Sequence, residues 1–142
     1  MVIKQISVIL DNVPGALSQV SELLGREGVN IRAVSVADTS DVSTVRFVVD
    51  DALKALNILR ANSYSIRETE VLAVETPDHP GGLNAVLKPL RAAGINVHYL
   101  YPHLGRVSGQ AIVILGVDKT EEAQEVLKRN WVKTLGPEAY TL

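Results

Sequence analysis

The sequence predicts an α+β fold in which two copies of one βαββαβ unit follow each other, each with an antiparallel sheet and both helices on one face. The first observation behind this prediction is an internal repeat, since a shift of 66 positions places Pro80-Gly81 on Pro14-Gly15. The second is the hydrophobic period, which changes in each half from two to the helical value and back. The shift also aligns Val8 with Val74, Leu17 with Leu83, Val20 with Val86, Leu24 with Leu90, Gly28 with Gly94 and Asn30 with Asn96.

The first strand and helix show the two periods most clearly. Ile6, Val8 and Leu10 alternate toward one face of a strand. From residue 15 the apolar residues form a helical stripe with polar side chains opposite. Gly28 ends this helix, because glycine most easily adopts the left-handed conformation after a last turn. The first unit is expected to have strand, helix, two strands, helix and strand over residues 2–10, 15–27, 29–37, 42–50, 51–62 and 64–69.

The second half of that unit returns to strands and then to a helix. Alternate apolar residues from Val45 to Val49 face one side, and a polar turn at residues 39–41 joins this strand to the one before it. Leu53, Leu56 and Leu59 belong to the apolar face of the next helix. No flexible linker follows the last, polar strand.

The second copy repeats this order, so we expect two domains, 1–69 and 70–142. Pro89 lies inside the first helix of the second copy, where it should bend or break the helix because it lacks an amide N–H. Gly136-Pro137 predicts that the last strand is short or displaced. The expected elements of the second copy are strand, helix, two strands and helix over residues 71–76, 82–93, 95–102, 107–117 and 119–130.

A βαββαβ unit of this length suits the ferredoxin-like arrangement. One face of the sheet has no helices in such a unit, and apolar residues such as Ile9, Val48 and Ile112 point toward it. Pairing of the two units, and then of two chains, would cover that face. We therefore expect a homodimer.

Both halves resemble ACT domains, the small regulatory modules that bind amino acids in metabolic enzymes. The resemblance covers residues 1–68 and 70–138, so the chain resembles a stand-alone tandem ACT protein. It implies that amino-acid ligands bind at interfaces between ACT domains, near the loop from the first strand to the first helix. The residues that carry the resemblance are ISVILDNVPGALSQVSELLGREGVNI and VLAVETPDHPGGLNAVLKPLRAAGINV.

The resemblance, carried over residue by residue, gives two loops of candidate ligand-binding residues. Asn30 and Asn96 are secondary candidates, with local bonding to the backbone at a strand start as the preferred interpretation. The first loop consists of Asp11, Asn12, Val13, Pro14, Gly15 and Ala16, and the second of Thr76, Pro77, Asp78, His79, Pro80, Gly81 and Gly82.

The chemistry of these loops suits the part that all α-amino acids share. A helix N-terminus has unpaired N–H groups and a partial positive charge, which favour a carboxylate, and the glycines allow close approach to the backbone. Asp11, Asn12 or Asp78 can accept hydrogen bonds from an ammonium group. The alternative is plain helix initiation, with Asp or Asn as the cap and Pro in the first turn. We expect the loops to differ in occupancy or preference, since the second contains His79 and an extra Gly82.

Composition excludes several other classes of function. The net charge is −2 and the pI about 5.9, so no basic surface is expected for nucleic acid or an anionic membrane. The absence of cysteine excludes disulfides, thiolate metal sites and cysteine nucleophiles. No apolar stretch approaches the roughly 20 residues of a membrane span, and the N-terminal segment lacks the features of a signal peptide. A cytoplasmic location and no cofactor are therefore expected.

The histidines do not predict a metal site. His98 and His103 stand five residues apart in an expected strand, so they face opposite sides of the sheet and do not share an ion. Tyr99 and Tyr101 share a face with His103 and could line a pocket. Packing is the favoured interpretation, because an aromatic stripe of period two ordinarily covers a sheet.

No motif predicts catalysis: the sequence has no nucleophile elbow, phosphate loop or H-E-x-x-H motif. The pairs Asp50–Asp51 and Glu121–Glu122 open helices, where acidic residues suit the helix dipole. We expect a non-catalytic regulatory protein that binds a free amino acid and signals to a metabolic enzyme or regulator. Three alternatives stay open: a regulatory subunit that stays bound to an amino-acid biosynthetic enzyme, a small enzyme on a ferredoxin-like scaffold, and an assembly module without a ligand.

Overall fold

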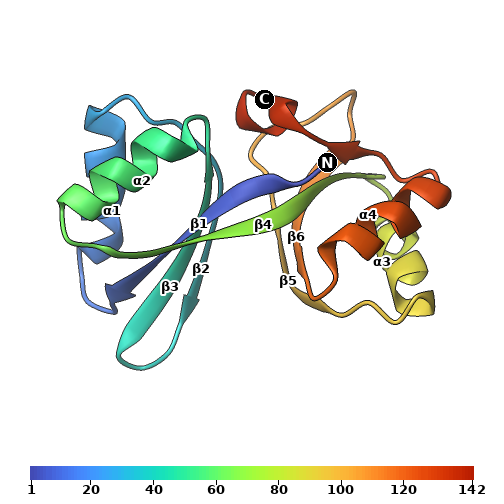
Figure 1. Cartoon of the computed structure of the whole chain (residues 1–142), viewed down its shortest axis with the longest axis horizontal. Helices are drawn as coiled ribbons and strands as arrows, with labels where there is room; N and C mark the ends of the chain where they lie inside the picture. The colour runs from blue at the N-terminus through green and yellow to red at the C-terminus, as the bar shows by residue number, and fades with distance from the viewer. The chain divides into compact units, whose positions relative to one another are not determined.

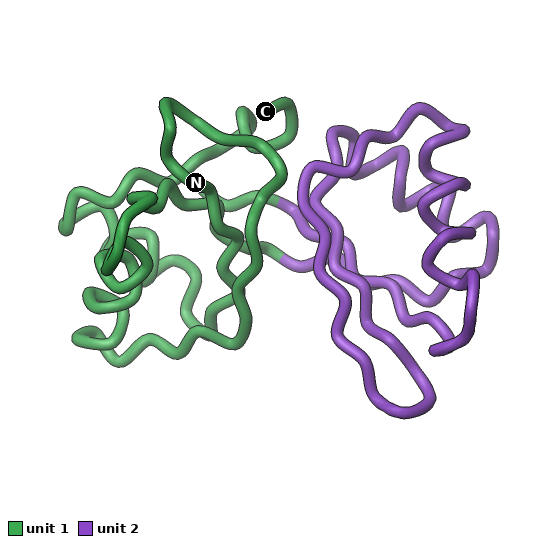
Figure 2. Tube along the Cα trace, turned by 180° about the vertical axis from the view of Figure 1, so that it is seen from behind, with its two compact units in different colours: residues 1–3, 70–142 green, residues 4–69 purple.

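The computed structural model describes all 142 residues, and the expected order of elements occurs twice in it (Figure 1). The chain forms two compact units (Figure 2). One unit consists of residues 4–69, and the other of residues 70–142 together with residues 1–3.

In the unit of residues 4–69 the strand order is β2-β3-β1-β4, and β3 pairs antiparallel with both β1 and β2. Both helices lie on one face of this sheet (Figure 1). Alternate residues of β1 and β3, such as Val8 and Phe47, pack there against Val20, Leu24 and Leu59 of the helices. The elements are β1 (Ile3–Asp11), α1 (Ala16–Arg26), β2 (Ile31–Asp38), β3 (Val42–Val49), α2 (Ala52–Ala61) and the first part of β4 (Ser65–Thr76).

The unit of residues 70–142 has the order β5-β6-β4-β7, again with antiparallel pairs. This order matches that of the other unit position for position. Val74, Val86, Leu90 and Leu127 belong to its core, between sheet and helices. The predicted fold class, two tandem βαββαβ units, is confirmed. The elements after β4 are α3 (Gly82–Ala92), β5 (Val97–Pro102), β6 (Ala111–Val117), α4 (Thr120–Arg129), β7 (Thr134–Leu135) and the 3₁₀ helix η1 (Pro137–Tyr140).

Four predicted details were wrong. Leu53, expected on the apolar face of α2, is 69% exposed, whereas Leu56 and Leu59 are buried. The strands expected at 64–69 and 71–76 form one continuous strand, β4, because no turn residue interrupts the alternation between the repeats. Strand β6 begins at Ala111 rather than at residue 107, since a tight turn pairs Val107 with Gln110. Pro89 does not break α3, which continues to Ala92, and the buried Val86 and Leu90 hold the helix in place. The short last strand is as predicted.

The N-terminal residues pack with the second repeat, although they precede the first one in sequence. Val2 lies against the core that contains Leu72 and Val74. The Met1 sulfur lies so close to Gly136 that a Cβ at that glycine would stand 2.7 Å from it. Of the apolar residues expected on the face without helices, Val48 and Ile112 are buried, whereas Ile9 is 45% exposed.

Candidate functional site

In each unit the Pro-Gly loop lies beside the hairpin that joins the second and third strands. Asp11 at the end of β1 pairs with Val42 at the start of β3, and Thr76 at the end of β4 pairs with Ala111 at the start of β6. Each loop therefore starts at the same edge of the sheet as the turn of the neighbouring hairpin. Residues 12–15 connect to α1 and residues 77–81 to α3.

Both helices that follow these loops begin at a glycine in the left-handed conformation. Gly15 has φ +86° and Gly81 has φ +83°, and no side chain caps either helix. Neither Asn12 nor Asp78 thus acts as the helix cap that plain initiation would require. The first turns of α1 and α3 also contain no acidic residue. By contrast, α2 is capped by Asp51, whose Oδ1 accepts a hydrogen bond from the Lys54 amide at 3.1 Å.

Helix α4 has no side-chain cap, but Glu121 and Glu122 lie in its first turn. The α1 and α3 N-termini are therefore the two among α1 to α4 with neither a side-chain cap nor an acidic residue in the first turn. Backbone amides at these two ends are also left without partners. The Leu17 and Ser18 amides of α1 have no backbone acceptor. Consequently no capping side chain or first-turn carboxylate neutralises the positive end of either helix dipole.

The space around the two capping glycines is open. A Cβ added at Gly15 or Gly81 would meet no atom within 4 Å, so the positive φ, and not crowding, requires glycine at these positions. Val13 is 57% exposed, and Pro14 and Pro80 are exposed as well. Ala16, Leu17 and Leu83 follow the glycines; Ala16 packs on the core, whereas the two leucines are 40% and 41% exposed.

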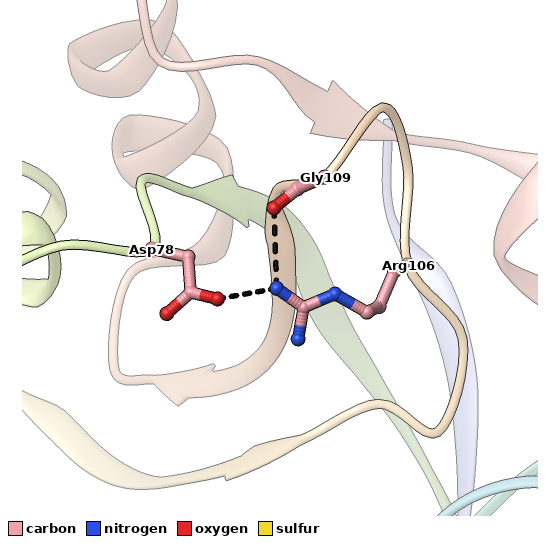
Figure 3. Close-up of polar contacts among 3 residues, drawn as sticks. All are labelled: Asp78, Arg106 and Gly109. Atoms are coloured by element: carbon pink, nitrogen blue, oxygen red, sulfur yellow. Dashed lines mark hydrogen bonds and ion pairs between the residues drawn. The ribbon is translucent and has the colours of Figure 1, made fainter.

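Asn12 and Asp78, which the repeat aligns, both connect their loop to the neighbouring hairpin. The Asn12 Nδ2 donates a hydrogen bond to the Thr39 carbonyl at 3.1 Å. Asp78 forms an ion pair with Arg106, which also donates to the Gly109 carbonyl at 3.1 Å (Figure 3). One copy uses an amide and the other an ion pair for the same connection. Asp11 has no such partner and is exposed.

The second loop contains a crowded glycine that the first loop lacks. A Cβ at Gly82 would stand 1.8 Å from the Pro77 carbonyl oxygen, so close backbone packing requires this glycine. The Gly82 amide donates to the His79 carbonyl at 2.9 Å. The exposed His79 places its Nδ1 2.9 Å from the Pro80 carbonyl. The extra glycine of the second loop thus serves the loop's own packing.

Asn30 and Asn96 lie at the other end of their sheets. The Asn30 amide donates to Asp50 Oδ1 at 2.9 Å, and the Asn96 amide donates to Asp118 Oδ1 at 3.0 Å. Ile31 pairs with Val49, so the eight residues of β3 separate Asn30 from the first loop by roughly 25 Å. The structure does not bring either asparagine together with the Pro-Gly loop of its own unit.

The histidines and tyrosines of the second unit have structural contacts. The buried His103 accepts a hydrogen bond from the Gly105 amide at Nδ1 and therefore donates from Nε2 to the Ala139 carbonyl, at 2.8 and 2.7 Å. The rings of Tyr99 and Tyr101 are stacked with centroids 6.4 Å apart. Tyr99 also covers Gly116, its cross-strand neighbour, at which a Cβ would stand 2.2 Å from the ring.

A pocket that the sequence did not predict lies beside the second loop. It has a volume of about 260 Å³, and Glu75, Pro77, Gln110, Trp131 and Lys133 are among its lining residues. The one sequence signal was Trp131, a bulky residue directly after a helix, where the first copy has Ser63. None of the helices in the chain is long and apolar enough to cross a membrane.

Comparison with known families agrees with the two-unit architecture. Residues 1–139 match the family described as ACT domain pair. The chain belongs to the ACT domain pair family. A comparison of this ACT domain pair with curated proteins gives no significant match.

Three solved structures illustrate what this ACT domain pair is similar to. Protein BT0572 from Bacteroides thetaiotaomicron is 33% identical, with a TM-score of 0.93 and coverage of 100% of this chain and 98% of that one. The ligand-free regulatory subunit of aspartate kinase from Thermus thermophilus is 16% identical, with a TM-score of 0.66 and coverage of 90% and 92%. A structure of aspartokinase alpha and beta subunits is 18% identical, with a TM-score of 0.58 and coverage of 92% and 96%. The last two show a shared fold.

Proposed function

We propose that this ACT domain pair is a non-catalytic regulatory protein that binds a free amino acid at its Pro-Gly loops. Binding changes the interaction of the chain with a metabolic enzyme or regulator in the cytoplasm. An effector of this kind acts through its different affinity for two arrangements of the protein.

The observation that carries the proposal is the pair of helix starts without caps. Helices α1 and α3 begin at equivalent left-handed glycines, with no side-chain cap and no acidic residue in the first turn. Such an end attracts a carboxylate, because its amides lack acceptors and the helix dipole is positive there. The same arrangement in both copies supports a common use.

The two loops differ in what they offer to the ammonium group of the ligand. Asp11 is exposed and has no ion-pair partner, whereas the charge of Asp78 is balanced by Arg106. The first loop is therefore the stronger candidate for a complete amino-acid site. The second loop binds more weakly or prefers a different ligand.

A thermal-shift screen with the twenty amino acids tests the proposal. One or a few of them should raise the melting temperature, because a ligand that binds the native state stabilises it by mass action. Leu17→Glu places a carboxylate at the first helix start, and Leu83→Glu places one at the second. We expect Leu17→Glu to abolish the shift and Leu83→Glu to reduce it less.

Leu17→Gln and Leu83→Gln are the matched controls, since they change polarity at the same exposed positions without adding charge. The shift should persist in both. If no amino acid raises the melting temperature at millimolar concentration, the proposal is wrong. It is also wrong about the site if the glutamate and glutamine variants behave alike.

The partner and the assembly are the second part of the proposal. We propose a homodimer, whose mass light scattering measures directly. A chain of the same fold is the regulatory subunit of aspartate kinase in Thermus thermophilus. Co-purification with a catalytic subunit would favour a permanently bound regulatory subunit, and a dimer that purifies alone would favour reversible signalling.

A further inference from the structure

Trp131 has a backbone conformation that needs an explanation. Its φ is +62°, a value that bulky residues rarely adopt, and its side chain is 95% exposed, so burial does not compensate for the strain. Ser63 occupies the equivalent position in the first copy with φ +64°. The turn therefore works with a small residue, and the fold does not require tryptophan there.

Two side chains that line the pocket beside Trp131 have hydrogen-bond acceptors without adequate partners. The Gln110 Oε1 atom is buried and has no hydrogen-bond partner. The Glu75 side chain is only 18% exposed, and its Oε1 lies 3.7 Å from Lys133 Nζ, which is too long for a good hydrogen bond. Lys133 itself is 64% exposed and can turn into solvent. A buried acceptor and a weakly balanced carboxylate both favour a donor with positive charge.

We propose that this pocket binds a small organic cation with a primary ammonium group. The Glu75 carboxylate accepts hydrogen bonds from the ammonium group, and Gln110 Oε1 does so once its side chain turns from its buried position toward the pocket that this residue lines. The Trp131 indole contacts the ligand at the mouth of the pocket, where the face of an aromatic ring attracts a cation. The volume of about 260 Å³ limits the ligand to a small molecule. This site lies within one unit; Pro77 of the second loop is among its lining residues, whereas Glu75, Gln110 and Trp131 lie outside that loop.

Fluorescence titration tests the proposal directly, because Trp131 is the single tryptophan of the chain. The probes are n-butylammonium, its neutral analogue n-butanol and the anion butyrate, none of which absorbs where tryptophan is excited. We expect n-butylammonium to change the emission saturably and the other two to leave it unchanged. An equal response to all three probes overturns the proposal.

Variants identify the groups that bind the cation. Glu75→Gln should weaken n-butylammonium binding roughly tenfold or more, since a hydrogen bond to a charged group is lost. Glu68→Gln is the matched control, because Glu68 forms a similar ion pair with Lys4 at 3.8 Å in the other unit. Lys133→Gln removes a competing cation and should tighten binding about threefold. An affinity of Glu75→Gln within twofold of the wild type overturns the proposal.

Trp131→Ser tests the aromatic contact with the residue that the first copy already uses. Its binding is measured by saturation-transfer NMR on n-butylammonium, a signal that does not need the indole. We expect the transfer signal to fall to background while the protein stays folded. A signal equal to that of the wild type contradicts the role of the indole.

Discussion

At the scale of single residues, the positions with positive φ are of two kinds, those occupied by glycine and those occupied by a residue with a side chain. Gly15 and Gly81 have positive φ, which glycine adopts without strain because it lacks a Cβ. Ser63 and Trp131, which follow the C-cap residues of α2 and α4, adopt positive φ although their side chains disfavour it. In both of those turns an asparagine amide, of Asn62 or Asn130, donates to the last turn of the helix at 2.8 Å. The asparagine cap therefore maintains each turn, so the identity of the residue after the cap can vary without loss of the turn.

Replacing Trp131 by glycine is expected to stabilise the protein. A non-glycine residue in the left-handed region costs about 1–2 kcal/mol, and the unfolded-state entropy of glycine offsets about 0.5–1 kcal/mol of that. We expect the free energy of unfolding to rise by about 0.5–1 kcal/mol, measured by urea denaturation. Lys128→Gly, in the right-handed last turn of α4, should instead lose about 1 kcal/mol. A loss of stability in Trp131→Gly would mean that the indole packs against the protein.

Gly82 and Gly25 should respond in opposite ways to alanine. A Cβ at Gly82 would overlap the Pro77 carbonyl oxygen, so Gly82→Ala should cost about 2 kcal/mol through overpacking. A Cβ at Gly25, inside α1, meets nothing within 4 Å, so Gly25→Ala should gain up to about 1 kcal/mol of helix propensity. Both changes are measured by chemical denaturation. Equal effects would show that the Pro77 contact does not restrict the second loop.

At the scale of elements, hydrophobic period and glycine position were enough to predict most helices and strands. The failures occurred where tertiary contacts decide the outcome. Helix α3 tolerates Pro89 because buried neighbours hold the helix, and β4 crosses the repeat boundary because nothing there stops a strand. The loop residues could be found from the repeat, but their contacts could not. Asn12 bonds to a carbonyl 27 residues away and Asp78 to a side chain 28 residues away.

The 3₁₀ helix at the C-terminal end provides a test by pH. Hydrogen bonds from the backbone of Glu138 itself and of Gly136 hold the pKa of the Glu138 carboxyl below its ordinary value of 4.5. A lowered pKa in the folded state means that the carboxylate stabilises the protein above pH 4.5 and loses this effect as the pH falls through the lowered value. The melting temperature of Glu138→Gln should therefore lie below that of the wild type at neutral pH, and the difference should shrink in acid.

Glu125→Gln, on the exposed side of α4, is the control for the loss of one carboxylate. The difference in melting temperature between Glu125→Gln and the wild type should not shrink in acid in the same way. Because Glu138 is exposed, solvent screens the interaction and the effect is small. A difference for Glu138→Gln that stays constant with pH would contradict the backbone hydrogen bonds as its source.

At the scale of the whole molecule, the repeat predicts the architecture but not the place of the chain's first residues. Residues 1–3 belong to the compact unit of residues 70–142, while residues 4–69 form the other. Sequence order alone assigns them to the first copy, and no periodicity distinguishes Val2 from the strand that it precedes. Val2 contacts a core that contains Leu72 and Val74, about 70 residues later in the sequence. Such a contact depends on tertiary packing, which local sequence patterns do not predict.

Val2→Ser tests this assignment. Val2 is partly buried against the core of residues 70–142, so its loss should cost about 1 kcal/mol. Because local stability follows the cooperative unit that a residue packs into, hydrogen exchange should speed up in peptides from residues 70–142 and stay unchanged in peptides from residues 4–69. Val13→Ser, at a position 57% exposed, is the matched control and should change neither set by more than about 0.5 kcal/mol. Faster exchange confined to residues 4–69 would show that the N-terminal residues stabilise the copy that they adjoin in sequence.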